Sequence, residues 1–247
     1  MKKREFFEFF KRGSLILTVA STVFLVPSLK ANIPGQVPRH TGNSSAASPP
    51  FGNTYDVLSV EWWLWYFMEP NPDHPQNGAP CSNGQSGNVW FLLGGPPAVD
   101  CTIPAGTALF FPIVNVECSS LEPFPFHGDT PQQRQDCAKA WIDNVTDLAA
   151  TIDGNAVVNL TRLRTRSGDF SFTVPYDNIY GLLPAPAWGF SSGDGYYILL
   201  APLSAGVHTI IVKGTFHDPF DPAHPVTFPL STELTLQVLP VTGRASY

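Results

Sequence analysis

Residues 60–68 of the chain read VEWWLWYFM, and five of these nine residues carry an aromatic ring. On a helix that turns by about 100° per residue, Trp62 and Trp63 fall on different sides, so the helix is apolar almost all round. Such a helix is typical of a buried element, whereas a helix on a membrane surface carries a basic face. The stretch therefore predicts a core helix, which ends near Met68 because Pro70 follows it.

A second helix is marked further along the chain. Thr130 is a capping residue, Pro131 suits the first helical position, and Gln133 stands where a capping box places a Gln or Glu. Apolar residues and a cysteine then recur at helical spacing at Cys137, Trp141, Val145 and Leu148.

Most of the remaining sequence is typical of short β-strands separated by Gly, Pro and polar residues. Asp153-Gly154 indicates a tight hairpin turn, and Ser191–Gly195 indicates a Gly- and Ser-rich turn. Strands are expected at 88–93, 107–114, 150–158, 170–174, 196–200, 207–212 and 230–238. This pattern predicts a mainly β fold, an antiparallel β-sandwich or jelly roll with two short helices.

The N-terminal residues are typical of a secretory signal. Basic residues precede an apolar run, Leu15–Val26, and a short stretch then ends at Ala31. The run is shorter than the ~20 apolar residues that span a bilayer, so we expect no stable membrane insertion after cleavage. We expect a signal peptide at 1–31, a flexible lead at 32–53 and one β-sandwich domain at 54–247. The expected location is secreted or periplasmic.

Composition and motifs exclude several classes of function. The 20 Asp and Glu outnumber the 14 Lys and Arg, which gives a net charge of −6. A nucleic-acid-binding domain carries a basic patch, so no nucleic-acid partner is expected. The sequence contains no Gly-x-Ser-x-Gly elbow, Walker loop, dinucleotide fingerprint or His-Glu-x-x-His motif. We therefore expect no cofactor, and no motif dictates a chemistry.

Four cysteines, an even number, favour disulfides in an exported chain. Three pairings are possible. Cys81–Cys101 with Cys118–Cys137 is favoured because each bond closes a loop of similar, modest length, which stabilises the fold by roughly 3 kcal/mol in the chain-entropy model. A metal site or a reactive thiol is the alternative, but no Cys-x-x-Cys spacing is present.

Several motifs resemble those of a group of exported bacterial proteins of unassigned function. They are EWWLW (Glu61–Trp65), GQSGNVWFL (Gly84–Leu92), PAGTALFFP (Pro104–Pro112), and DGYY (Asp194–Tyr197) with GVHT (Gly206–Thr209). The resemblance covers most of residues 54–238 and implies a shared fold. It implies no activity, since a sandwich fold by itself supplies none.

Carboxylates offer one route to catalysis. Two carboxylates close together in space can perform hydrolysis, and the candidates are Glu61, Glu117, Asp169 and Asp194. Asn115, Glu117 and Ser119 follow the strand expected to end at Val114, so they are expected at a sheet rim, where sites often lie. Ordinary loop polarity is the simpler interpretation for these three, and a helix-dipole contact or an ion pair is the simpler one for Glu61.

An aromatic group near the Ser191–Gly195 turn offers a route to binding. Exposed rings beside an acidic turn suit the flat apolar faces of sugars, and the alternative is that these rings complete the core. Phe190 belongs to the group, and the predicted ligand-binding residues are Trp188, Asp194, Tyr196 and Tyr197. Strand alternation sends Tyr196 and Tyr197 to opposite faces, so only one of them can line the site.

The segment His217–His224 (HDPFDPAH) places two His and two Asp within eight residues. Its prolines and its lack of apolar periodicity favour an exposed hairpin loop. Zinc sites more often draw on spaced ligands with defined geometry, so no metal site is expected here.

These patterns support three functions. The first is an exported, non-catalytic binding module whose partner is a carbohydrate or another envelope component. The second is a carboxylate-based hydrolase, for which no catalytic residue can be named. The third is a structural envelope protein.

Overall fold

The computed structural model describes residues 52–95, 99–181, 186–221 and 226–240. The expected signal peptide and nearly all of the expected lead lie outside this range. The helices are α2 (Tyr55–Met68) and α3 (Pro131–Asp143), with 3₁₀-helices η2 (Asn71–Asp73), η3 (Pro75–Asn77) and η4 (Leu160–Leu163). The strands are β1 (Val89–Phe91), β2 (Val99–Ile103), β3 (Ala108–Ser119), β4 (Val145–Ile152), β5 (Asn155–Ala156), β6 (Arg164–Arg166), β7 (Phe170–Val174), β8 (Ala187–Leu200), β9 (Gly206–His217) and β10 (Thr227–Val238).

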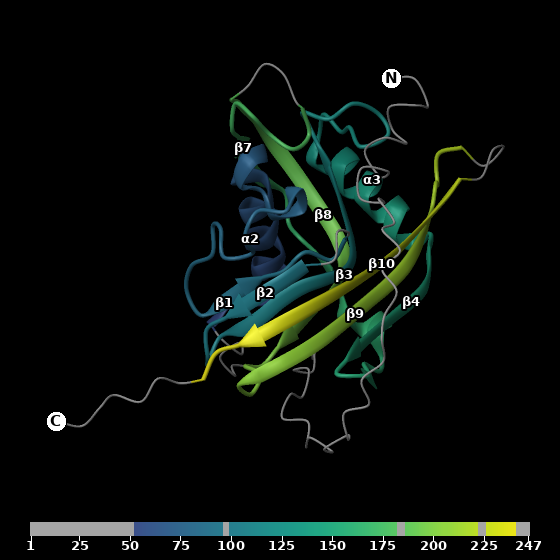
Figure 1. The fold of residues 1–247 in the computed structure, drawn as a ribbon. Coiled ribbons are helices and arrows are strands. Elements are labelled where there is room, and N and C mark those ends of the chain that lie inside the picture. Colours follow the sequence, from purple (N-terminus) through teal and green to yellow (C-terminus); the bar gives the residue numbers. More distant parts are fainter. Residues whose placement is uncertain (1–51, 96–98, 182–185, 222–225, 241–247) are drawn as a thin grey trace, which may run out of the picture.

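The strands form two five-stranded sheets. The first sheet has the order β1-β3-β8-β6, with β7 also paired to β8, and the second has the order β2-β10-β9-β4-β5. Aliphatic side chains of β3 and β8 pack against those of β9 and β10 between the two sheets. The predicted mainly β, sandwich-like fold with two helices is confirmed (Figure 1).

Each sheet is mixed, whereas the sequence pattern predicted antiparallel pairing throughout. Strand β1 runs parallel to β3, and β2 runs parallel to β10, while the remaining pairs are antiparallel. Strands β1 and β3 lie in the first sheet, and β2, which comes between them in the chain, lies in the second. The chain therefore returns to the first sheet by a crossover, and a crossover joins parallel strands where a hairpin would join antiparallel ones.

Helix α2 covers the outer face of the first sheet (Figure 1). Its aromatic rings pack against apolar side chains of β3, β7 and β8. Trp62 is only 3% exposed, and its Nε1 donates to the carbonyl oxygen of Leu92 at 2.8 Å. Trp65 is also buried, and its Nε1 donates to the carbonyl oxygen of Asn83 at 3.0 Å. The predicted core helix is confirmed, and the indole N–H groups of Trp62 and Trp65 are each satisfied by a backbone carbonyl.

Helix α3 lies on the other side of β8 and fills one end of the space between the sheets (Figure 1). Thr130 and Gln133 form the predicted capping box. Trp141 is buried in an aromatic cluster with residues of β9 and β10. Val145 and Leu148, which the spacing assigned to the same helix, belong to β4, because the helix ends before them.

Both predicted disulfides are confirmed. Cys81 bonds to Cys101, with Cα atoms 5.7 Å apart, and this bond ties the segment before β1 to β2 in the second sheet. Cys118 bonds to Cys137, with Cα atoms 6.1 Å apart, and this bond ties β3 to α3. Each bond thus ties a strand to a segment outside its own sheet.

Strands β3 and β8 are longer than the sequence predicted. β3 continues to Ser119 after an irregularity near Pro112, so Asn115 to Ser119 form part of a strand and not a rim. The predicted turn Ser191–Gly195 was wrong, because these residues lie inside β8. Gly193 is needed in this strand because a Cβ there would lie 2.5 Å from Nε1 of Trp63 on α2. Close approach of the helix, and not a turn, explains the glycine.

Candidate functional site

Two exposed aromatic rings lie in the N-terminal half of β8. Trp188 is 62% exposed and Phe190 is 37% exposed, and their ring centroids lie 4.7 Å apart in an edge-on arrangement. On β7, Thr173 lies directly opposite Trp188 and Ser171 directly opposite Phe190, and both hydroxyl-bearing residues are exposed. Residues directly opposite in a sheet point to the same face. Trp188, Phe190, Ser171 and Thr173 therefore form one strip, which we call the aromatic shelf.

A partly buried ion pair lies against the Phe190 ring of the aromatic shelf. The guanidinium of Arg134 lies 5.4 Å from the centroid of the Phe190 ring. Its Nε and Nη2 donate to the two carboxylate oxygens of Asp169 at 2.7 and 2.8 Å, and Nη1 donates to the carbonyl oxygen of Gly128 at 3.0 Å. The hydrogen bond from Arg134 lowers the pKa of Asp169. The positive charge beneath the shelf is therefore neutralised, and the shelf itself carries no charged group.

The other predicted ligand-binding residues do not join Trp188. Asp194 is 1% exposed and accepts two hydrogen bonds from Arg164, at 2.9 and 2.6 Å. It stands six residues from Trp188 along β8, which corresponds to ~20 Å in a strand. Tyr197 is fully buried and its hydroxyl accepts from Asn115 at 3.2 Å, while Tyr196 packs among apolar side chains. The predicted grouping of Trp188 with Asp194, Tyr196 and Tyr197 was wrong, because the expected turn is an extended strand.

The alternation of the two tyrosines is confirmed. Tyr197 packs beneath α2, and Tyr196 packs among side chains between the sheets. Burial raises the pKa of Tyr197, so its hydroxyl stays neutral. Neither ring belongs to the aromatic shelf.

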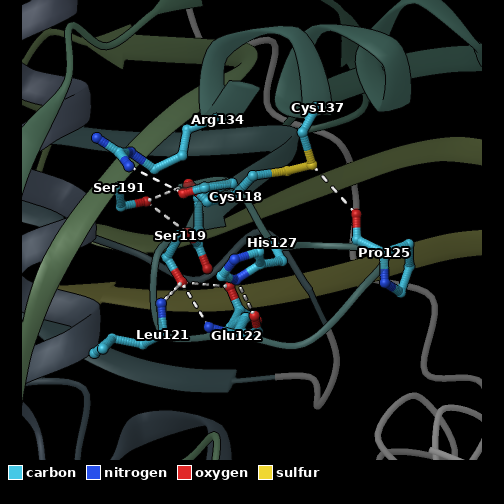
Figure 2. The surroundings of a disulfide bond; sticks show 11 residues. Cys118, Ser119, Leu121, Glu122, Pro125, His127, Arg134, Cys137 and Ser191 are labelled. Carbon is cyan, nitrogen blue, oxygen red and sulfur yellow. Dashed lines mark hydrogen bonds between the residues drawn. A yellow bond between two sulfur atoms is a disulfide. The ribbon is translucent and has the colours of Figure 1, made fainter. Parts of the chain in front are cut away.

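A pair of carboxyl groups lies on the face of the first sheet opposite to the aromatic shelf. Glu117 of β3 is 5% exposed and accepts a hydrogen bond from the Ser191 hydroxyl at 2.5 Å. Glu122, in the loop after β3, is half-buried, and its carboxyl hydrogen-bonds to that of Glu117. The Ser119 hydroxyl lies 3.2 Å from Oε2 of Glu122 (Figure 2). Burial raises the pKa of both carboxyls, and the nearby charge of Glu117 raises that of Glu122 further.

The four carboxylates proposed for hydrolysis do not converge. Glu61 accepts from Asn53 at 2.8 Å, and Asp169 and Asp194 each bind an arginine. Glu117 and Asp169 lie on opposite faces of the first sheet, since they bind the adjacent residues Ser191 and Ser192 of β8.

Glu122 was not among the predicted residues. Its signal was the Ser-x-x-Glu spacing from Ser119, whose hydroxyl accepts from the Glu122 amide at 3.2 Å.

The loop that begins at His217 contributes polar contacts of its own. His217 Nε2 lies 2.9 Å from the Thr146 hydroxyl, and Asp218 accepts from the Phe220 amide at 2.8 Å. Residues 222–225, which include His224, lie outside the described residues. In the part of the chain that the structure describes, no three His, Cys, Asp or Glu side chains gather as a metal site would require.

A buried histidine lies next to Tyr66 of α2. His74 is fully buried, its Nε2 donates to the Tyr66 carbonyl oxygen at 3.0 Å, and its Nδ1 accepts from the Gln76 amide at 3.1 Å. The ring is therefore neutral, with the proton on Nε2. Burial lowers the pKa of His74 to about 4.

We expect His74 to destabilise the fold in acid. In the unfolded chain, His74 binds a proton at about pH 6.5, whereas in the folded chain it does so only at about pH 4. The stability that depends on the neutral ring is therefore complete above about pH 6.5 and is lost as the pH falls toward about 4. From the pKa of about 4, the loss is about 3 kcal/mol. Urea unfolding at several pH values should show wild type losing this amount relative to His74→Gln, which cannot titrate. A stability difference between the two proteins that stays constant with pH would contradict it.

No comparison with known proteins assigns this chain to a family. No family model matches the chain, and no curated protein matches it. Among solved structures, a cysteine protease inhibitor from Entamoeba histolytica is 14% identical, with 60% of this chain and 96% of that chain covered and a TM-score of 0.23. Amebosin is 13% identical, with 62% and 99% covered and a TM-score of 0.18. The cadherin-like domains of zebrafish RET are 14% identical, with 63% and 27% covered and a TM-score of 0.23. Scores this low carry no argument about function.

Two findings bear on the compartment. The structure contains two disulfides, which persist in oxidising compartments such as the periplasm and the extracellular space. Neither of the two helices within the described residues has the length and hydropathy needed to cross a bilayer. Both findings are consistent with an extracellular or periplasmic protein.

Proposed function

We propose that this protein is an exported, non-catalytic binding module for a glycan or another envelope component. It would be secreted or periplasmic after removal of the signal peptide at 1–31, and would share its fold with the group of exported bacterial proteins that its motifs resemble. The single observation that supports binding is the aromatic shelf, on which Trp188 is 62% exposed.

The shelf suits a sugar ring in three respects. An exposed indole offers a flat apolar face, on which the C–H face of a pyranose can stack. Ser171 and Thr173 stand directly across from the two rings and supply hydroxyls, which both donate and accept hydrogen bonds. Arg134 is already neutralised by Asp169, so the shelf favours an uncharged glycan chain over an acidic one.

The hydrolase alternative is favoured by one observation, the Glu117–Glu122 pair. Glycosidases of the two-carboxylate type separate these groups by ~5–9.5 Å to fit the sugar and the water. Glu117 and Glu122 are in direct hydrogen-bond contact and lie on the face of the sheet opposite to the shelf. The pair therefore suits proton sharing better than glycoside hydrolysis, and binding without catalysis remains the preferred function.

We expect Trp188→Ala to weaken glycan binding by about tenfold or more, equal to about 1.4 kcal/mol. The free energy of unfolding should change by less than about 0.5 kcal/mol, because the ring is mostly solvated. Binding can be measured by affinity electrophoresis of the purified protein in a panel of neutral and acidic polysaccharides. Tyr176→Ala is the matched control, since Tyr176 is 78% exposed and lies outside the shelf. If wild type binds no polysaccharide, or if Trp188→Ala binds as well as wild type, the proposed function is wrong and a structural role is favoured.

A further inference from the structure

The loop after β3 contacts both the carboxyl pair and the aromatic shelf. It leaves the sheet at Ser119 and returns at Gly128, and we call it the 119–128 loop. Its two ends are held together because the Ser119 amide donates to Phe126 O at 2.9 Å and the Gly128 amide donates to Ser119 O at 3.0 Å. The adjacent Cys118–Cys137 disulfide fixes the same end of β3 to α3 (Figure 2). Any movement of the loop is therefore confined to the residues between its ends.

The first residues of the loop pair with the strand that carries the shelf. The Ser120 amide donates to the Phe190 carbonyl oxygen at 2.9 Å, and the Phe190 amide donates to the Ser120 hydroxyl at 3.0 Å. Leu121 packs directly on Gly189, where an added Cβ would lie 2.6 Å from Leu121 Cγ. This end of β8 is thus held on one edge by β7 and on the other by the loop.

Glu122, the next loop residue, contacts Glu117 through its carboxyl group. When the pair carries one proton, the carboxyl groups of Glu122 and Glu117 share a hydrogen bond, and Glu117 also accepts from Ser191. Glu117 is fixed in a buried strand, whereas Glu122 is half-buried in a loop. If both carboxyls ionise, two like charges stand in contact in a low-dielectric site, and such a pair repels strongly. Glu122 is the partner that can leave.

The groups around the pair are neutral or tied to other partners. Tyr66 on α2 and Tyr180 after β7 face it, and burial raises the pKa of both phenols, so they stay neutral. Ser119 and Ser191 contact it from β3 and β8. Within the loop, His127 donates from Nδ1 to the Glu122 carbonyl oxygen at 2.7 Å, and its Nε2 contacts Asp129 at 3.0 Å.

We propose that the proton shared by Glu117 and Glu122 controls the aromatic shelf. While the proton is present, the 119–128 loop is closed on β8 and the shelf is rigid. When the proton is lost, residues 120–122 separate from β8 and the shelf loses affinity for its ligand. The part that concerns ligand affinity rests on the proposed function, whereas the movement of the loop does not.

The sign of the effect follows from the raised pKa values of the pair. The closed form keeps its proton to a higher pH than a free glutamate, whose pKa is about 4.3. Closure is therefore complete in acid and is lost as the pH rises through the raised value. Between the pKa of the open form and the raised pKa of the closed form, the ratio of closed to open molecules falls by about tenfold per pH unit. The shelf should bind well in acid and release its ligand on alkalinisation.

The amides of Ser120 and Phe190 report closure directly, because they form the hydrogen bonds between the loop and β8. Their hydrogen-exchange protection, corrected for intrinsic rates, can be followed by NMR on the full chain from about pH 4 to about pH 9, a range that begins near the pKa of a free glutamate. We expect wild-type protection to fall about tenfold per pH unit across the transition. Glu122→Gln should stay protected throughout, since its amide can donate to Glu117 without a proton to lose.

Two further variants make the result decisive. Glu117→Gln should also abolish the transition, which covers the case that Glu122→Gln does not fold. Glu61→Gln, at a carboxylate bonded to Asn53, should keep the wild-type transition. Protection that is independent of pH in wild type, or a transition that persists in both glutamine variants of the pair, would overturn the proposal.

The ligand arm is read separately. Affinity for a polysaccharide that wild type binds should fall with rising pH in wild type and stay constant in Glu122→Gln. If no polysaccharide binds at any pH, the proposed function fails, and the exchange data still decide whether the loop is controlled by the proton. If the exchange transition is present but affinity does not follow it, the control of the shelf is refuted.

Discussion

Trp62→Ala is expected to lower the free energy of unfolding by about 3–5 kcal/mol, the range for large aromatic truncations in cores. Trp62 is 3% exposed and stacks on Tyr66, with ring centroids 5.2 Å apart. The edge of Trp63 meets the same indole, with centroids 4.8 Å apart. Truncation leaves a cavity and also removes the donor to the Leu92 carbonyl oxygen. Urea unfolding followed by circular dichroism measures the loss.

The matched control is Trp188→Ala, which removes the same side chain from the surface. Trp188 is 62% exposed, so its loss should cost less than about 0.5 kcal/mol. Trp65→Ala should behave like Trp62→Ala, because Trp65 is buried and bonded to Asn83. Equal stability of Trp62→Ala and Trp188→Ala would show that α2 does not form the core of the outer layer.

Arg164→Met is the second substitution with a large expected effect. Arg164 makes a two-pronged contact with Asp194, which is 1% exposed, and this hydrogen bonding raises the pKa of the Arg164 guanidinium. Removing one partner of a buried ion pair leaves an uncompensated charge and typically costs about 3–5 kcal/mol. Arg166, 3.3 Å from the same carboxylate, should retain part of that energy, so we expect the lower end. Urea unfolding at neutral pH measures the change.

A surface ion pair provides the control. Lys139 and Asp143 form an exposed pair one turn apart on α3, and Asp143 also accepts from Arg164 at 2.7 Å. Lys139→Met leaves that bond in place and should cost about 0.5 kcal/mol or less. The double variant Arg164→Met with Asp194→Leu should recover stability relative to Arg164→Met, because no buried charge then remains unpaired. A double variant no more stable than the single one would mean that packing of Arg164, and not its charge, holds β6 on β8.

Local patterns predicted the elements whose stability is local. The aromatic stretch, the capping box at Thr130 and the turn at Asp153-Gly154, which joins β4 to β5, were all predictable from neighbouring residues. The disulfide pairing also followed from loop length. The parallel pairs β1–β3 and β2–β10 were not predictable, because the partners belong to distant parts of the chain. Parallel pairing depends on which sheet each segment joins, and no local pattern records that.

The candidate site was predicted in part. Trp188 was among the predicted ligand-binding residues, and the structure exposes it. Asp194 was misplaced because Ser, Gly and Asp together normally indicate a turn, whereas here the two glycines admit Trp63 and Asn115 against β8. Glu122 was missed because its partner, Glu117, was expected at a rim. A buried carboxyl pair becomes visible only when the strand and the loop are placed together.

The pairing of β2 with β10 also determines the order in which the chain can fold. Val99 lies opposite Leu234, so the edge strand of the second sheet waits for a partner 234 − 99 = 135 positions further along the chain. Contacts between such distant residues form late, because the chain loses the entropy of closing the intervening loop before these contacts stabilise the fold. A chain that emerges N-terminus first can bury α2 only after β3, β7 and β8 have appeared, and can complete the second sheet only when β10 follows. Until then β2 presents an unpaired edge, which exposes it to wrong pairing with a neighbouring chain.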